Sequence, residues 1–338
     1  MQCQWKDKVL AVNDSTFDKL ALDLFHFQYE NNDVYQQYIK ALQIDPGTVK
    51  TIEQLPFLPL RFFKSHAIQT TSFDPDIVFE SSGTTGTVNS RHYIKDSQWY
   101  KEVFTKGFEL FYGPAKDWCI LGLLPSYLER ENSSLVFMVN ELIRLSGHSQ
   151  SGFYLDDYNK LSSLIKELEQ QNQKTLLIGV TFALLDFASV YSGGSERAAL
   201  RHTVIMETGG MKGRRKEMIR AEVHAILNTS FDLPIIHSEY GMTELLSQAW
   251  SAGNGVFKGP PWMKVLIREE DDPLEIRSQR LHTNAPVSGA INIIDLANIY
   301  SCSFIATDDA GKLLPDGSFE VLGRIDNSDI RGCSLMVV

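Results

Sequence analysis

The sequence predicts an α/β fold in which a largely parallel sheet is followed by a smaller β-rich lobe. Up to about residue 250, short apolar runs alternate with amphipathic segments, as expected where strands and helices alternate. After residue 260 the helical periodicity fades and only short strand-like runs remain. Strands are expected at 119–124, 175–180, 203–206, 234–236, 265–267, 290–294, 304–306 and 319–322, and helices at 133–145, 158–170 and 214–227.

The N-terminal part is expected to form a helix and then an extended segment. The helix is predicted to start near Ser15, with Asp18 as its partner in a capping-box-like pair, and to run through Phe27. Prolines bias the residues before them away from helix, so residues 55–59 are predicted to be extended. We divide the chain into residues 1–78 packing on the core, an α/β core at 79–260 and a β-rich lobe at 261–338.

The composition is typical of a soluble enzyme and argues against two classes of partner. The 338 residues are 43% hydrophobic and 22% charged. The net charge of −10 disfavours nucleic acid, and the basic cluster at 212–216 is short and isolated. Residues 1–30 hold no apolar signal core, and the most apolar stretch, 176–185, falls short of the roughly 20 residues that span a bilayer. We therefore expect no nucleic-acid binding and no membrane insertion.

The four cysteines, Cys3, Cys119, Cys302 and Cys333, lie far apart and show no paired spacing. This pattern indicates a reducing compartment and predicts neither a disulfide framework nor a zinc site. Cys119 and Cys302 adjoin apolar runs and are expected in the core. A cytoplasmic location follows as the expectation.

The most informative segment is Ser81-Ser82-Gly83-Thr84-Thr85-Gly86-Thr87, directly after a strand-like run at 77–79. Its two glycines let the backbone fold tightly, so that N–H groups can converge on an anion while the hydroxyls donate further hydrogen bonds. It lacks the Gly-Lys-Ser/Thr ending of a P-loop. A polar turn between two strands would use the same residues. The segment alone predicts either a phosphate loop or a turn.

The stretch Ser81 to Gly86 resembles the phosphate-binding signature of the adenylate-forming superfamily, which includes acyl-CoA synthetases, luciferases and peptide-synthetase adenylation domains. Three further motifs that resemble the superfamily follow in order. They are Glu207-Thr208-Gly209-Gly210, then Ser238-Glu239-Tyr240-Gly241-Met242-Thr243-Glu244, and finally Thr307-Asp308-Asp309-Ala310-Gly311 with Asp316-Gly317 and Gly323-Arg324. The resemblance implies the large N-terminal domain of an adenylate-forming enzyme, with ATP bound in the 79–260 core.

The resemblance also implies the role of each motif residue, with ATP and Mg²⁺ as the ligands. The phosphate loop and Arg91 would bind phosphates, and Thr243 would contact the α-phosphate. Glu244 would bind Mg²⁺, Asp309 would hold the ribose and Arg324 would contact the nucleotide. The nucleotide would be lined by Gly209, Gly210, Glu239, Tyr240 and Gly241. Each residue also has a local explanation. Glu244 could be a first-turn carboxylate of a helix, Asp309 a turn residue and Arg324 an exposed charge at a strand end.

The sequence departs from the superfamily pattern in two places. Asn89 stands where relatives usually have a lysine, although Arg91 and Lys95 follow close behind and could neutralise the leaving pyrophosphate. Relatives also continue past the Gly-Arg motif as a mobile small domain with a catalytic lysine. Because this sequence stops at Val338, the expectation is a chain that lacks that domain.

The truncated layout resembles the acyl-protein synthetase branch of the bacterial fatty-acid reductase complex. The resemblance implies activation of a fatty or related carboxylic acid, followed by transfer to a cysteine near the C-terminus. Cys333 is in that place, and with Thr243, Glu244 and Arg324 it completes the predicted catalytic set. The expected partner is an acyl-accepting reductase or another protein. Two alternatives stay open: a carboxylate–CoA ligase of the phenylacetate type, and a nucleotide-binding protein that has lost turnover.

Overall fold

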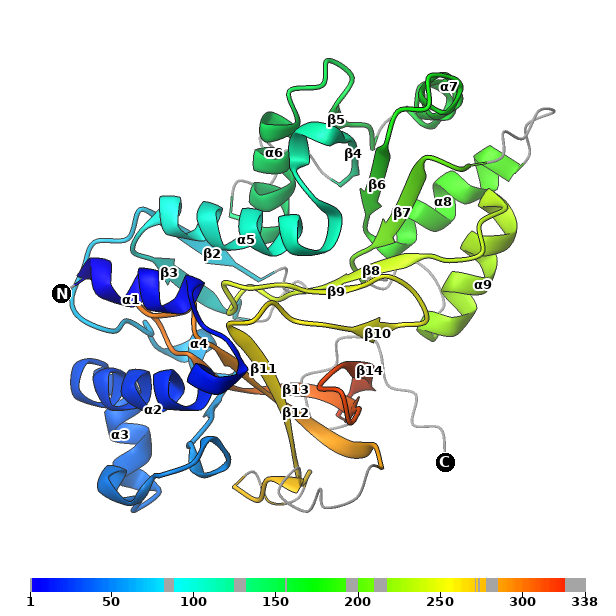
Figure 1. The fold of residues 1–338 in the computed structure, drawn as a ribbon. Coiled ribbons are helices and arrows are strands. Elements are labelled where there is room, and N and C mark those ends of the chain that lie inside the picture. The colour runs from blue at the N-terminus through cyan, green and yellow to red at the C-terminus, as the bar shows by residue number, and fades with distance from the viewer. Residues whose placement is uncertain are drawn as a thin grey trace. The chain divides into compact units, whose positions relative to one another are not determined.

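The computed structural model describes residues 2–81, 88–124, 132–155, 157–192, 200–209, 218–270, 272, 274–277 and 285–325. The chain forms two compact units (Figure 1). Unit 1 comprises residues 1–104, 242–248 and 258–329, and unit 2 comprises 105–241, 249–257 and 330–338. The chain passes from unit 1 into unit 2 within the helix α5 (Ser97–Tyr112).

Unit 2 is built on a mostly parallel sheet with the strand order β5-β4-β6-β7-β8-β9. Each neighbouring pair is parallel except β8 and β9, which are antiparallel. The predicted α/β class is therefore confirmed. The strands are β4 (Cys119–Leu123), β5 (Gly152–Phe153), β6 (Thr175–Gly179), β7 (Thr203–Glu207), β8 (His237–Tyr240) and β9 (Ala249–Ser251), with the short β10 (Val256–Phe257) following in the chain.

Helices cover both faces of this sheet, as the cyan to yellow-green elements of Figure 1 show. The helices α7 (Tyr158–Gln170), α8 (Thr181–Ser192) and α9 (Arg220–Phe231) pack on one face, and α6 (Ser134–Ser146) and the second half of α5 lie on the other. A short 3₁₀ turn at Ala115–Asp117 leads into β4. Because both faces are covered, β4 and β6 are buried at every position.

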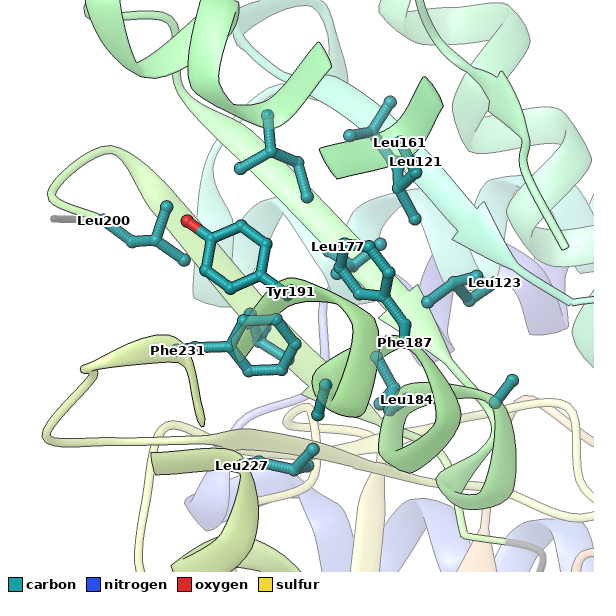
Figure 2. Packing of buried hydrophobic residues seen from close by; sticks show 14 of the residues in the cluster. Leu121, Leu123, Leu161, Leu177, Leu184, Phe187, Tyr191, Leu200, Leu227 and Phe231 are labelled. Carbon is teal, nitrogen blue, oxygen red and sulfur yellow. The ribbon is translucent and has the colours of Figure 1, made fainter. Parts of the chain in front are cut away.

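A large apolar cluster of unit 2 lies between the sheet and the helices α7 to α9 (Figure 2). Leu121 and Leu177 reach it from the strands, and Phe187, Tyr191 and Phe231 reach it from the helices. The ring centroid of Phe187 lies 5.6 Å from that of Phe231 and 5.8 Å from that of Tyr191. The cluster also contains Cys119, and Cys302 is fully buried in unit 1, so the prediction that both are core residues is confirmed.

Unit 1 combines an antiparallel sheet with the N-terminal helices. Its strands β14-β13-β12-β11 are antiparallel neighbours, and β1 pairs in parallel with β13, joining Leu58 to Ile305. A separate hairpin is formed by β2 and β3. The strands are β1 (Leu58–Pro59), β2 (Ile77–Glu80), β3 (Arg91–Ile94), β11 (Met263–Arg268), β12 (Val287–Asp295), β13 (Phe304–Leu313) and β14 (Phe319–Arg324).

The helices of unit 1 are α1 (Gln2–Leu10), α2 (Asp14–Asn31), α3 (Asp33–Ala41) and α4 (Phe62–Ser65), with 3₁₀ turns at Pro46–Thr48 and Ile52–Gln54. The helices α2 and α3 pack on the sheet through aromatic contacts around Phe304, whose ring centroid lies 6.2 Å from that of Phe25 and 6.1 Å from that of Tyr35. The buried Gln28 side chain adds hydrogen bonds from Nε2 to the carbonyls of Asn298 and Ile299.

Some boundaries differ from those expected. The helix predicted near Ser15 is α2, and α1 precedes it. The N-cap of α2 is Asn13, whose side chain accepts a hydrogen bond from the Ser15 amide, and Thr16 completes the capping box. The predicted Ser15–Asp18 pair is therefore wrong. The strand predicted at 234–236 begins instead at His237, since Pro234 cannot donate to a ladder. The helix predicted from 214 starts at Arg220 and runs to Phe231, and residues 210–217 lie outside the described residues.

Other expectations hold. The segment 55–59 is extended and ends in β1, and the strands expected after residue 260 are present as β11 to β14. The three-part division of the chain stays a prediction. No helix in the described part of the chain is long and apolar enough to cross a bilayer.

Replacing Phe187 by alanine should destabilise the protein by about 3–5 kcal/mol, because it opens a cavity in the cluster of Figure 2. Val190→Ala on the same helix is the matched control, since Val190 is exposed and should cost no more than about 0.5 kcal/mol. Urea unfolding of both variants measures the difference. Equal losses would show that this cluster does not stabilise the fold.

Candidate active site

The predicted phosphate loop connects the two strands of the β2–β3 hairpin. The Ser81 amide donates to the Ser90 carbonyl at 3.0 Å, and the Ser90 amide donates to Ser81 Oγ at 2.9 Å. These hydrogen bonds join the two ends of the loop next to the paired strands β2 and β3. Ser82, Gly83, Thr84, Thr85 and Gly86, which were predicted to bind phosphate, lie outside the described residues.

Three residues follow the loop where the sequence lacks the usual lysine. Arg91 opens β3, opposite Glu80, and its Nε lies 3.1 Å from the Glu80 carboxylate. Lys95 Nζ lies 4.5 Å from the centroid of the Tyr300 ring, in a cation–π contact. The Asn89 Oδ1 atom is buried and has no hydrogen-bond partner among the described residues. Arg91 is the more exposed of the two cations, and its predicted contact with phosphate stays a prediction.

The predicted residues Thr243 and Glu244 lie in a tight turn of unit 1 that is held by a buried polar network. Asn298 Nδ2 donates to the Glu244 carbonyl at 2.8 Å. His92 contacts the Thr243 carbonyl through Nδ1 at 2.8 Å and Asn298 Oδ1 through Nε2 at 3.1 Å. Burial lowers the pKa of His92 to about 4 against the opposing effect of these two oxygens, so its ring is neutral at pH 7 and its single N–H donates to one of them.

The chain after Glu244 is anchored to the end of β12 by Asp295. This fully buried carboxylate accepts the amides of Leu246 at 2.8 Å and Ser247 at 2.9 Å, and the Ser247 hydroxyl at 2.6 Å. Burial raises the pKa of Asp295, while these hydrogen bonds oppose the rise. The alternative in which Glu244 belongs to the first turn of a helix is wrong, because residues 243–244 form a turn and the described residues 245–257 are not helical.

Sequence reasoning did not identify His92, Asn298 or Asp295 as part of the site. They hold the backbone of the motif, and no motif letter marks them. The only signal in the sequence was indirect: polar residues at 295 and 298 inside an otherwise apolar stretch. Buried polar groups need partners, so such residues mark a buried network.

In unit 2, β8 carries Glu239 and Tyr240, whose side chains point to opposite faces of the sheet because they are adjacent in a strand. The Tyr240 ring centroid lies 5.8 Å from that of Phe257. Glu239 is paired across the ladder with Trp250 of β9, on the face where Phe108 and Tyr112 of α5 contact the Trp250 ring. The two predicted nucleotide contacts therefore lie on different faces.

Glu207, the last residue of β7, is the organising carboxylate of the Gly-Gly motif. It accepts the Gly209 amide at 2.7 Å and lies 3.1 Å from Arg220 Nε and 3.5 Å from His224 Nε2. Gly209 has φ of +72°, a conformation that favours glycine. Sequence reasoning quoted Glu207 but gave it no role, and Gly210 lies outside the described residues.

The two buried carboxyls Glu207 and Glu239 have opposite protonation states. Burial acts to raise the pKa of Glu207, but the hydrogen bond from His224 and the charge of Arg220 outweigh it and lower the pKa to about 2. Burial raises the pKa of Glu239 to about 8, and the negative charge of Glu207 adds to this rise. At pH 7, Glu207 is therefore ionised and Glu239 is mostly protonated.

Asp309 of β13 and Arg324 of β14 are brought together by the sheet. They are direct partners in the ladder, and Arg324 Nε lies 3.6 Å from the Asp309 carboxylate. Asp309 is buried within the strand, so the alternative of a simple turn residue is wrong. Arg324 is one-third exposed, at the end of β14.

The described site residues are divided between the two units. Unit 1 carries Ser81, Arg91, Thr243, Glu244, Asp309 and Arg324, and unit 2 carries Gly209, Glu239, Tyr240 and Gly241. Gly241 and Met242 are consecutive, so the motif that contains Tyr240 and Thr243 runs from one unit into the other. Cys333 lies outside the described residues.

The fold is that of adenylate-forming ligases. A solved structure of 2-hydroxyisobutyryl-CoA ligase, in complex with its acyl adenylate and CoA, matches with a TM-score of 0.60. It is 12% identical and the match covers 93% of this chain and 69% of that one. The likeness shows the fold and agrees with the superfamily that the motifs predicted.

Residues 10–338 match the model of the family described as acyl-protein synthetase, LuxE. The chain belongs to this family and is an AMP-forming ligase that activates an acid. Two relatives are long-chain-fatty-acid–luciferin-component ligases, from Aliivibrio fischeri with 21% identity and from Vibrio harveyi with 22%. Each match covers 94% of this chain and 86% of the relative.

Asn298→Ala should slow acid-dependent pyrophosphate release, because it removes the donor that holds the Glu244 carbonyl and leaves His92 Nε2 without its partner. The loss of stability should be about 1–3 kcal/mol. Asn31→Ala is the matched control, since its amide also donates to a carbonyl at 2.8 Å but on the surface of α2. If both variants keep the wild-type rate, the network does not position the turn.

Glu239→Gln should become more stable relative to wild type as the pH rises from 5 to 8.5. A carboxyl whose pKa is raised in the folded state keeps its proton while the unfolded chain loses it, so wild-type stability falls between about pH 4.5 and 8. Glutamine mimics the neutral acid, and the gain should be on the order of 1–3 kcal/mol. Urea unfolding at both pH values measures it, with the exposed Glu30→Gln as control. A pH-independent difference would contradict the buried neutral carboxyl.

Proposed function

We propose that this chain activates a long-chain fatty acid with ATP and Mg²⁺ and passes the acyl group to the thiol of Cys333, from which a partner protein takes it. The family assignment over residues 10–338 supports the acyl-protein synthetase reaction, and the names of the relatives from Aliivibrio fischeri and Vibrio harveyi support a long-chain fatty acid. The partner is proposed to be an acyl-accepting reductase, because the resemblance to the fatty-acid reductase complex implies one.

The observation that carries the nucleotide site is the pairing of Asp309 with Arg324. A carboxylate held at a strand position, with a guanidinium 3.6 Å away, offers acceptors for two ribose hydroxyls and a cation beside them. The two residues come from opposite ends of the last motif of the resemblance, and the ladder of β13 and β14 makes them neighbours. This geometry supports a ribose role for Asp309 and a nucleotide contact for Arg324.

The proposed metal ligand, Glu244, fits Mg²⁺ better than a metal whose ligands all come from the protein. Mg²⁺ is usually held by one or two carboxylates together with substrate phosphates. Glu244 supplies one hard oxygen ligand in the anchored turn, and in the described part of the chain no three His, Cys, Asp or Glu side chains gather into a cluster. Bound there, Mg²⁺ would neutralise charge on the phosphate oxygens.

The first chemical step joins the acid to the nucleotide. A carboxylate oxygen attacks the α-phosphorus of ATP, the bond from that phosphorus to the bridging oxygen breaks, and pyrophosphate leaves with the electron pair. The chain's own contribution is to align the groups: Thr243 would donate to the α-phosphate from the turn fixed by Asn298 and Asp295. Arg324 and Arg91 would offset negative charge on the nucleotide.

The second step transfers the acyl group. The thiolate sulfur of Cys333 attacks the acyl carbon of the mixed anhydride, the carbon–oxygen bond to the phosphate breaks, and AMP leaves. The cysteine proton goes to solvent. A thiolate is a competent nucleophile for this acyl donor. By contrast, Cys119 and Cys302 are buried, and burial raises their pKa values to about 11 and about 12, which makes both unsuitable.

Intact-protein mass spectrometry after incubation with ATP, Mg²⁺ and fatty acids of different length tests the proposal. Wild type should gain one acyl mass that depends on ATP, and Cys333→Ser should gain none while still releasing pyrophosphate. Glu244→Gln should block both steps. Cys3→Ser, which removes a thiol at the other end of the chain, is the control and should still be acylated.

Three results would contradict parts of this scheme. An acyl adduct that persists in Cys333→Ser excludes Cys333 as the carrier. AMP formation that requires CoA, without any adduct, identifies a carboxylate–CoA ligase instead. Full activity of Glu244→Gln removes Glu244 from the site.

A further inference from the structure

Unit 1 contains a buried guanidinium, that of Arg268, which forms no ion pair within 4.0 Å among the residues the structure describes. The charges of Asp308 and Glu270 act on it only from a greater distance. Arg268 ends β11 and is only 9% exposed. Its Nη1 donates to the Ile291 carbonyl at 3.0 Å and to Asn292 Oδ1 at 3.1 Å, and its Nη2 donates to the Thr307 carbonyl at 2.9 Å. Burying a charge without an ion pair is costly, so a retained arginine at this place needs a reason.

The reason is visible in the ladder between β12 and β13. Ala290 pairs with Ala310 and Asn292 pairs with Ala306, so only Ile291 faces the stretch 307–309. This mismatch is a β-bulge, and bulges take residues out of the regular ladder and re-aim side chains. The bulged stretch is the one that carries Asp309, the predicted ribose ligand.

Arg268 supplies the hydrogen bonds that the bulge removes. The carbonyls of Ile291 and Thr307, from opposite strands of the bulge, both accept from its guanidinium. Thr307 Oγ1 also donates to the Ile291 carbonyl at 2.9 Å and accepts the Asp309 amide at 3.2 Å. A chain of contacts therefore runs from Arg268 through Thr307 to the backbone of Asp309.

Arginine suits this task better than lysine. Its planar fork presents several donors in fixed directions and spans two carbonyls on different strands at once, whereas an ammonium is a single point on a flexible stem. Because the guanidinium stays charged over the physiological range, the bulge is held at any pH at which the enzyme works.

We propose that Arg268 is a positioning residue for nucleotide recognition: by holding the β12–β13 bulge it sets the direction of the Asp309 carboxylate toward the ribose hydroxyls. This inference rests on the proposed ribose role of Asp309. It assigns to Arg268 an effect on sugar recognition that a merely stabilising arginine would not have.

The test compares ATP with 2′-deoxy-ATP and 3′-deoxy-ATP in acid-dependent pyrophosphate release, using the whole chain. Wild type should prefer ATP, and Asp309→Ala should abolish the preference. Arg268→Met, which keeps length and packing but removes the fork, should lower the preference about tenfold, the size expected for one lost hydrogen bond to a charged group. The loss should appear mainly in KM for ATP.

Two further variants keep the test decisive if Arg268→Met does not fold. Arg268→Lys retains the charge but not the fork and should also lose most of the preference. Thr307→Val leaves Arg268 intact and cuts the link to the Asp309 amide, so it should reduce the preference as well. Arg277→Met is the matched control, because Arg277 also donates to a β12 carbonyl, that of Ser288 at 2.8 Å, but on the exposed side of the lobe.

The outcomes separate the two claims. If Asp309→Ala keeps the wild-type preference for ATP, the proposed ribose role of Asp309 is wrong. If Asp309→Ala loses the preference while the folded Arg268 variants and Thr307→Val keep it, Arg268 is a structural residue only and our inference is overturned.

Discussion

The hydrogen bonds that Asp295 accepts are the constraint on which the candidate site of unit 1 depends. One fully buried carboxylate, at the end of β12, takes two backbone amides and a hydroxyl from the segment that follows Glu244. The backbone carbonyls just after Asp295 accept hydrogen bonds from other elements. The Ala297 carbonyl accepts from Trp99 of α5, and the Asn298 carbonyl accepts from Gln28 of α2. The turn that carries Thr243 and Glu244 is thus fixed to the same few residues that hold the N-terminal helices to the sheet.

The buried charges share one condition: each ionised side chain has several hydrogen-bond partners, as Arg268 does, or a counter-charge. Glu207 meets this condition through His224, Arg220 and Gly209 and is ionised. Glu239 does not meet it and is mostly protonated at neutral pH. The two carboxyls lie on neighbouring strands, and ionising both would set two negative charges against each other in a region of low dielectric constant.

Sequence patterns predicted most of the strands and helices because these elements bury one regular face. The helix at 158–170 was predicted with both of its ends, and the strands around Leu121 and Leu177 followed from continuous apolar runs. Pattern reasoning was less successful at the ends of elements. Asn13 was overlooked as a cap because Ser15 offered a similar signal two residues later.

Only the residues of the candidate site that belong to motifs could be predicted from the sequence. Asp309 and Arg324 were named from the two ends of one motif, but their pairing depends on the register of β13 and β14, which periodicity does not specify. The supporting residues Arg268, Asn298 and His92 act through backbone carbonyls. Any segment can offer a carbonyl, so no motif identified these three residues, and only Asn298 had an indirect signal as a polar residue in an apolar stretch.

The path of the chain has a consequence for biosynthesis. Unit 1 takes its helices from the first 104 residues and its sheet from the last third of the chain, and β1 pairs directly with β13. Nearly all of unit 2 is contiguous, at 105–241 with 249–257. During synthesis the parallel sheet of unit 2 can therefore fold early. The apolar faces of the N-terminal helices stay exposed until the last strands of unit 1 have been made. The newly made chain is most in need of a chaperone during that interval, and the segment to protect is α2 with its buried Phe17, Leu24 and Phe25.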